Sequence, residues 1–391
     1  MLALWPFTPN WEQPVTETLT WLTDVQRSST GAELRRALRL APRRSFAAQV
    51  LAAGPERTLF DLWVHTRASS PLALPIWPDV QLLQADLLPG STAVACRTAG
   101  FDFVAGGQAA LLGESALDGE LVMVDNVTPA GLALQEPVAQ TWPAGTRLYP
   151  VRQARLAELP EVTRKTDALL TAEVRFNVQE PCDWPAAVPA PLYRSAPVFA
   201  QRPDESQDLT RGFERLTELL DNETGIPHLT DTAGRGFTLQ QHRWVLHGRS
   251  EQAAMRGLLY HLRGQQRPCW LPTHAADLLP LASSANNLTV ARCGYAAHAP
   301  LAPGRRDVRL ELLDGSSLHR RITAAAQVGD TEVLALDGPA PAASSIARAS
   351  FMALARLAGD DVQIDHITDA DGLARVATTW RSLRDELEAT P

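Results

Sequence analysis

The segment CWLPTHAAD contains the residue types of a nucleophilic triad. Cys269 lies five residues before His274, and Asp277 follows close by. A thiol activated by an imidazole, which a carboxylate orients in turn, is a common arrangement for nucleophilic catalysis. A second part of the chain repeats this region as LALPIWPDV, with neither Cys nor His. We therefore interpret the segment as a packed strand, and an active site is the weaker hypothesis.

The other histidines also have plain structural interpretations. His242 and His247 flank the segment WVL, and their odd separation places them on opposite faces of a regular strand, so they cannot chelate one metal together. Two further groups have the residue types of metal ligands, but we interpret them as polar loop residues. The sequence therefore predicts no catalytic, metal-binding or cofactor-binding residues. The two groups are His228 with Asp231, and Asp365 and His366 with Asp369.

The cysteines and the motif content agree with this interpretation. The chain has four cysteines, and none lies in a CxxC pair or at the spacing of a zinc or iron–sulfur site. We expect them to be reduced thiols in a protein core. The sequence contains no P-loop, GxGxxG, HExxH or GxSxG signature. We predict that the protein is not an enzyme and uses no cofactor. The cysteines are Cys96, Cys182, Cys269 and Cys293.

An internal repeat organises the chain. Residues 22–31, LTDVQRSSTG, recur at 216–225 as LTELLDNETG. After each copy comes an Arg-containing segment, a hydrophobic strand, a helix-like stretch and a segment rich in Pro and Trp. A repeated order of this kind indicates two copies of one structural unit. We therefore expect the two halves of the chain to share a fold.

Local patterns predict the elements of each unit. Ser45–Leu51 and Leu239–Leu246 read as strands bounded by Gly54 and Gly248. Residues 55–67 fit an amphipathic helix with Pro55 in its first turn. Residues 250–263 fit a second helix, with Ser250 as its N-cap and Gly264 as its stop.

Short β segments separated by glycines interrupt both units, which indicates a small inserted barrel or sandwich. We predict a β-rich α+β protein with two tandem tube-like β-sandwich units, a flanking helix in each, and two inserted β modules. The first unit comprises residues 1–85 and 151–180, with its inserted module at 86–150; the Pro-rich segment 181–203 is a linker; the second unit comprises residues 204–280 and 360–385, with its inserted module at 281–359.

Composition narrows the function. The chain has 391 residues and a net charge of −8, which argues against a general nucleic-acid binder because phosphate contacts need Lys and Arg. It contains no run of about 18 apolar residues, so no membrane anchor is predicted. The cations are almost all Arg, and Lys165 is the only Lys. Arg suits protein–protein contacts because its guanidinium makes planar, bidentate hydrogen bonds.

Several segments together resemble a tail protein of tailed phages and prophages, over nearly the whole chain. They include WPFTPNWEQPVTETLTWLTDV, STGAELRRALRLAPRR, ALPIWPDV, DNETGIPHLTDTAGRGF and DADGLARVATTWR. The segment around STGAELRRALRLAPRR is also similar to the opening of distal tail proteins. The resemblance implies a virion component that is made and assembled in the host cytoplasm. It implies a ring in the tail tip or baseplate, between the tail tube protein and the baseplate hub protein.

The resemblance and the repeat together suggest how the ring is built. A chain with two tube-like units matches a six-fold tube with three copies as well as with six. Further partners would be the tape measure protein and tail fibres, and DNA would contact the ring only in transit through its lumen. Two alternatives remain: a central hub that closes the tube, and a tail-associated carbohydrate-binding or cell-wall hydrolytic protein.

The clustered arginines are candidates for contacts between subunits. Such clusters are usually solvated faces, but in a ring they could form salt bridges with a neighbouring subunit. We expect substitution of Arg43 and Arg44 by Ala to weaken ring assembly. The candidate interface residues are Arg35, Arg36, Arg39, Arg43, Arg44, Arg305, Arg306 and Arg309.

Overall fold

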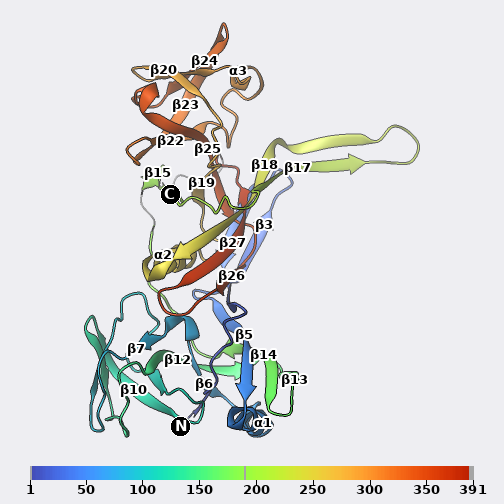
Figure 1. The fold of residues 1–391 in the computed structure, drawn as a ribbon. Coiled ribbons are helices and arrows are strands. Elements are labelled where there is room, and N and C mark those ends of the chain that lie inside the picture. Colours follow the sequence, from blue (N-terminus) through green and yellow to red (C-terminus); the bar gives the residue numbers. More distant parts are fainter. Residues whose placement is uncertain (1, 189–190, 387–391) are drawn as a thin grey trace.

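A computed structural model describes residues 2–188 and 191–386, and most of its regular structure is antiparallel β-sheet. This confirms the predicted β-rich α+β class. The first half of the chain lies at the bottom of Figure 1, and the second half lies above it. A long hairpin, formed by β17 and β18, projects sideways from the upper half. The molecule is therefore elongated, with one arm.

The first half contains a sheet in the order β13-β14-β5-β2. Its long strand β5 alternates buried and accessible residues because one face covers the core. The elements of this half are β1 (Ala3–Leu4), β2 (Val15–Thr20), β3 (Thr23–Arg27), β4 (Glu33–Ala37), β5 (Arg43–Ala53), α1 (Pro55–Arg67), β6 (Leu72–Pro75), η1 (Trp77–Asp79), β7 (Gln81–Leu82), β8 (Ala93–Ala95), β9 (Gln108–Leu112), β10 (Gly119–Thr128), β11 (Gly131–Leu134), β12 (Arg147–Leu156), β13 (Val162–Arg164) and β14 (Leu169–Val178).

The second half contains a sheet in the order β26-β27-β18-β17. Both hairpin strands of this half extend well beyond the sheet. The elements are β15 (Leu192–Tyr193), β16 (Ala196–Pro197), β17 (Thr210–Leu220), β18 (His228–His247), α2 (Gly248–Leu262), β19 (Cys269–Pro272), β20 (Pro280–Ser284), β21 (Asn287–Ala291), α3 (Tyr295–His298), β22 (Asp307–Leu312), β23 (Ser317–Val328), β24 (Thr331–Leu336), η2 (Ala343–Ser345), β25 (Ile346–Leu357), β26 (Asp361–His366) and β27 (Leu373–Ser382).

The same strand register occurs in both halves. Thr16 pairs with Ala47 in the first half, and Thr210 pairs with Gln241 in the second. Farther out, Thr23 pairs with Ala37, and Thr217 pairs with Asp231. All four second-half positions follow their first-half positions by one constant offset. Below, residues at the same place in the two registers are called counterparts.

The core of each half also contains counterpart residues. Trp5 donates its backbone N–H to Ala73 O at 2.9 Å, and Phe199 donates to Trp270 O at 2.9 Å. Trp5 and Phe199 are both buried among the aromatic and aliphatic side chains of their own half. The two halves therefore begin with the same attachment of an extended segment to a buried strand.

The helices lie where the sequence places them, with one correction. Helix α1 spans the predicted residues and buries Phe60 against the core. Helix α2 begins at Gly248, whose positive φ of 71° turns the chain out of β18. Ser250 is not the N-cap; His247 is, and its backbone N–H is held by the Glu251 carboxylate at 2.8 Å. The Glu251 side chain, inside the helix, therefore accepts a hydrogen bond at the helix start, where the sequence predicts Ser250 as the cap.

The inserted modules share a strand order. The first runs β12-β9-β10-β11-β8, and the second runs β25-β22-β23-β24-β21. Each module has a hydrophobic cluster of its own. The buried residues of the first cluster fall within residues 83–148, and those of the second fall within residues 278–349. Strands β12 and β25 continue into the parent sheets, so each module is an outgrowth of its sheet.

The predicted linker 181–203 is partly folded. Residues 189–190 lie outside the described residues, but the segment after them forms β15 and β16. Tyr193 packs at 5.3 Å between ring centroids against Trp270, and Phe199 enters the second core. Proline removes a backbone donor without preventing burial, so this Pro-rich segment packs where its aromatic residues find a core.

Candidate functional site at the junction of the two halves

Strand β2 joins the two halves. One of its edges pairs with β5 of the first half, and the other pairs with β26 of the second half. The pairs along the second edge run from Val15 opposite His366 to Thr20 opposite Asp361. The sheets of the two halves are therefore continuous, in the order β13-β14-β5-β2-β26-β27-β18-β17.

Side chains of β2 enter both cores. Val15 belongs to the hydrophobic cluster of the first half, and Leu19 belongs to that of the second. Both are 0% exposed. Burying an aliphatic side chain of this size contributes about 1.5–3 kcal/mol. The strand therefore stabilises each half with residues from one segment.

Asp360 extends the junction beyond the end of β2. Its backbone carbonyl accepts a hydrogen bond from Trp21 N at 3.0 Å. Its carboxylate accepts from Thr23 N at 2.7 Å and from Thr23 Oγ1 at 2.8 Å. An ionised acceptor makes these bonds stronger than those between neutral groups. The second half thus holds the base of the first hairpin, β3–β4.

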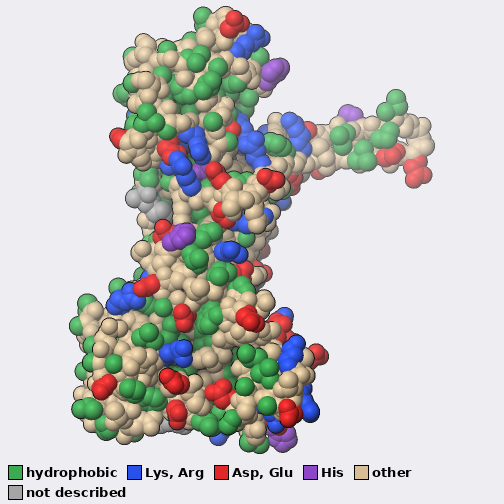
Figure 2. Space-filling view, viewed as in Figure 1, with side chains coloured by type: hydrophobic (Ala, Val, Ile, Leu, Met, Phe, Trp, Pro, Cys, Tyr) green, Lys and Arg blue, Asp and Glu red, His purple; other side chains and the backbone are tan. Residues whose placement is uncertain are grey.

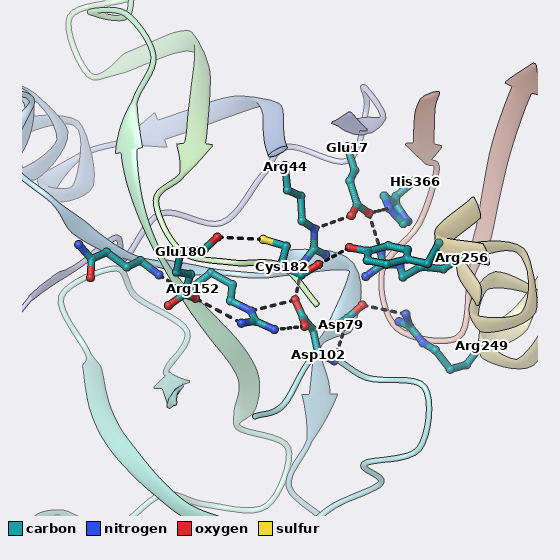
Figure 3. A network of polar contacts seen from close by, with 12 residues as sticks. Glu17, Arg44, Asp79, Asp102, Arg152, Glu180, Cys182, Arg249, Arg256 and His366 are labelled. Carbon is teal, nitrogen blue, oxygen red and sulfur yellow. Dashed lines mark hydrogen bonds and ion pairs between the residues drawn. The ribbon is translucent and has the colours of Figure 1, made fainter. Parts of the chain in front are cut away.

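A buried charge network lies under the paired strands (Figure 3). The Glu17 carboxylate accepts from Arg44 Nε at 2.5 Å and from Arg256 Nη2 at 2.7 Å, and His366 Nε2 lies 3.0 Å away. Burial opposes the charge of Glu17, but Arg256, Arg44 and His366 hold its pKa well below the ordinary value. The Glu17 carboxylate therefore binds side chains from three elements, β5, α2 and β26.

Asp102 adds the first inserted module to this network. It is buried and forms ion pairs with both Arg44 and Arg152. Burial alone would raise the pKa of Asp102, but these two guanidinium groups hold it below the ordinary value. Burial would likewise lower the pKa of Arg44, but Glu17 and Asp102 raise it well above the ordinary value. Arg44 thus links a carboxylate of β2 to one of the module.

A third ion pair connects η1 to α2. Arg249 Nη1 donates to Asp79 Oδ1 at 2.8 Å, and the other Asp79 oxygen accepts from Asp102 N at 2.8 Å. The Arg249 guanidinium also lies over the Phe101 ring, 4.4 Å from its centroid. Removing one partner from a buried ion pair is strongly destabilising. The network is therefore suited to holding the halves in one fixed orientation.

The predicted interface arginines separate into two groups. Arg44 and Arg309 are buried, at 3% and 8% exposure, so the expected role of both between subunits is corrected to a role inside the chain. The charge of Arg44 is enclosed because carboxylates from β2 and the inserted module meet there, and Arg309 lies 3.6 Å from the Glu311 carboxylate. The remaining six are partly or fully accessible: Arg35, Arg36, Arg39, Arg43, Arg305 and Arg306.

Several accessible arginines have partners in the same chain. Arg35 binds Glu33 at 2.6 Å and donates to Gln265 O at 2.9 Å. Arg306 forms an ion pair with Asp385 at 3.1 Å. Arg36 and Arg43 are exposed.

The structure does not assemble a nucleophile from Cys269, His274 and Asp277. Cys269 is 0% exposed in the second core, and burial raises the pKa of its thiol. Asp277 accepts hydrogen bonds from Thr273 and from Phe351 N. A buried thiol with a raised pKa is a poor nucleophile. The three residues therefore serve packing and turn formation.

His274 instead faces His242, with 5.9 Å between ring centroids. Burial, with the nearby His242 and Arg309, lowers the pKa of His274 to about 3, and burial lowers that of His242 to about 4. His247 is exposed on the other face of β18, as strand alternation requires.

The other predicted loop residues lie partly in strands. His228 and Asp231 lie in β18, and Asp365 and His366 end β26, so the loop interpretation is wrong for these four and holds for Asp369. Sequence reasoning missed the hydrogen bond between His366 and Glu17 because they are 349 positions apart. Among residues 2–188 and 191–386, no group of three or more His, Cys, Asp and Glu side chains is placed to hold a metal ion.

A surface groove lies over β5, β14 and β13, on the face of the sheet opposite the core. It encloses about 410 Å³ and lies against β14 and the 158–161 segment. Three carboxylates line it, from Glu158, Glu161 and Glu173, together with Arg175.

No protein-family model matches this chain, and no curated protein matches it. Within the described residues, none of the helices has the length and apolar character needed to cross a membrane.

Proposed function

We propose that this protein is a structural component of a bacteriophage tail tip or baseplate. It forms a ring at the distal end of the tail tube and connects the tube to the hub and fibres. The observation that carries the proposal is the continuous sheet through the β2–β26 junction, in which one chain places two sheets of the same register side by side.

The charge network supports a structural role. Its carboxylates are enclosed by arginines of the same chain and are buried, so they are not presented to a substrate. Such a network restricts how the two halves sit relative to each other. A fixed angle between neighbouring units is what a ring needs, because the same rotation must repeat until the ring closes.

The sequence resemblance supplies the biological setting. It covers nearly the whole chain and includes the segments that form the β3–β4 and β17–β18 hairpins. In this proposal the protein is part of the virion and is assembled in the host cytoplasm. Its partners are other copies of itself, the tube protein and the hub protein. The inserted modules carry fibres or other receptor-binding parts.

Labelled particles test the proposal. A short peptide tag would be inserted at the exposed turn after Gly329, between β23 and β24 of the second module. Antibody-gold imaging of the resulting virions should place the label at the distal end of the tail, around an open lumen. Label along the tube or on the head would contradict the proposal. A closed lumen would instead favour the hub.

A further inference from the structure

Two strand edges of the continuous sheet have no partner strand among the described residues. Strand β17 pairs with β18 alone, and β13 pairs with β14 alone. In the register of the halves, β17 is the counterpart of β2, and β13 is the counterpart of β26. Inside the chain, β2 and β26 pair with each other. Their counterparts β17 and β13 lie at the two open ends of the sheet, so the same pairing is possible between two copies of the chain.

The side chains of β17, and of Leu209 directly before it, show what the missing strand would cover. Leu209 and Phe213 are the counterparts of Val15 and Leu19, which are 0% exposed at the internal junction. At the open edge Leu209 is 36% exposed and Phe213 is 68% exposed. The same positions thus carry hydrophobic residues in both halves, but only one pair is buried. An exposed edge with apolar side chains is a ready template for another strand.

The edge at β13 also exposes apolar side chains. Leu159, just before β13, and Val162, within it, are 72% and 48% exposed. Transferring the register of the internal junction places Phe213 opposite Pro160. Both open edges therefore expose apolar surface where this register would bring them together.

The hydrogen bonds between Asp360 and Thr23, at the end of the internal junction, also have equivalent residues at the open edges. Thr217 is the counterpart of Thr23, which Asp360 holds at the internal junction. Glu158 lies within one residue of the position that corresponds to Asp360, and its side chain is 65% exposed. A threonine on one edge and a carboxylate on the other are thus available for the same interaction.

We propose that β17 pairs antiparallel with β13 of a second copy of this chain, with Arg211 opposite Val162 of that copy. The contact repeats the β2–β26 junction between molecules. It rests on the proposed ring function and specifies the surface that builds the ring. Because the two surfaces differ, the contact is head-to-tail, and such a contact builds a ring when the repeated rotation returns to the first copy.

The projecting hairpin fits the same arrangement. At the internal junction the tip of the first hairpin lies against β18, where Thr232 Oγ1 donates to Ser29 O at 2.5 Å. The tip of the second hairpin extends away from its own chain (Figure 1), and hydrophobic side chains lie on its surface (Figure 2). In the ring this tip lies on the first hairpin of the next copy. The exposed hydrophobic residues of the tip are Leu219, Leu220, Ile226 and Leu229, at 63%, 63%, 97% and 62% exposure.

Disulfide trapping tests the register. The variant R211C/V162C would be made in a C96S/C293S background, which removes the two accessible native thiols. Directly opposed residues bring their β-carbons near disulfide distance. Mild oxidation of the purified chain should yield covalent oligomers. The control R211C/T163C shifts one cysteine to the other face of the strand and should remain monomeric under denaturing conditions. Equal cross-linking of both pairs, or of neither, would overturn the proposal.

A second variant tests the contact without new cysteines. Phe213→Asp places a charge at the paired edge, and it should raise the concentration for half-assembly about tenfold or more because a buried aromatic contact is lost. The matched control is Leu313→Asp, at a residue 72% exposed on the second module. Sedimentation velocity over a concentration series measures both. A wild-type chain that stays monomeric throughout, or equal assembly of the two variants, would refute the contact.

These outcomes are independent of the proposed function. Trapping and sedimentation use the purified chain alone, without tube, hub or virion. A ring that forms in vitro while the tag is missing from the distal tail would leave the β17–β13 contact standing and refute the tail-tip role. A label at the tail tip, with a purified chain that stays monomeric and forms no in-register cross-link, would support the tail-tip role and refute the β17–β13 contact.

Discussion

His242 and His274 show how burial controls charge at the residue scale. Burial keeps both rings neutral, with pKa values of about 4 and about 3 against an ordinary 6.5. Both ring nitrogens of His274 and Nδ1 of His242 lack a hydrogen-bond partner in the described residues. Below about pH 6.5 these two histidines therefore bind protons in the unfolded chain but stay neutral in the folded chain.

The free energy of unfolding should accordingly be insensitive to these histidines above pH 6.5 and decrease as the pH falls from about 6.5 towards 4. One pKa unit corresponds to about 1.4 kcal/mol, so the pair should account for a loss on the order of 5 kcal/mol. Urea denaturation at several pH values measures it. H242F/H274F should make the dependence shallower, with the remainder from His319, whose pKa burial also lowers to about 4, whereas the exposed control His247→Gln should retain the full dependence. A wild-type curve that is flat between pH 6.5 and 4 would contradict this.

At the scale of elements, each half depends on an extended segment that attaches to its buried strand. Trp5 lies 4.8 Å from the Trp63 ring and 4.9 Å from the Phe176 ring, between centroids, and so ties β1 to α1 and β14. The attachment is formed by residues from three separate elements. A cavity there would affect the packing of all three.

Trp5→Ala should therefore lower the free energy of unfolding by about 3–5 kcal/mol, the usual cost of removing a buried large aromatic. Trp11→Ala is the control, because Trp11 is only partly buried against the same core. Thermal and urea denaturation measure both variants. A loss for Trp5→Ala no larger than for Trp11→Ala would show that the segment is not needed to hold the helix on the sheet.

The element predictions succeeded where the signal was local. Residues 55–67 form the expected helix because apolar residues recur at helical spacing after Pro55. Ser250 was wrongly assigned as the cap because Gly248, with its positive φ, allows the helix to start earlier. The linker prediction for 181–203 was partly wrong because Pro content reports local stiffness and not whether Phe199 finds a core.

For the whole molecule, the junction determines how the two halves are oriented. Glu17 is 0% exposed and holds Arg44 and Arg256, which come from different halves. Its depressed pKa means that its contribution is present above the ordinary pKa of 4.5 and is lost as the pH falls through the folded value. Acid should therefore weaken the junction.

Glu17→Gln keeps the shape of the side chain but removes its charge. It should reduce the free energy of unfolding by about 3–5 kcal/mol, because buried arginines lose their counter-charge. The control is Glu173→Gln, whose side chain is 63% exposed and whose ion pair with Arg175 lies in solvent. Chemical denaturation at pH 7 measures both. Equal stability of the two variants would mean that the network does not hold the halves.

The sequence by itself determined the local elements and the repeated order, because strand alternation, helical spacing and turn residues act over neighbouring positions. It also predicted the β-rich class. The tertiary structure alone decided that β2 lies between the halves and that Glu17 meets His366, 349 positions away. Such a contact depends on which strand edges meet after folding, and neither residue carries a local signal of its partner.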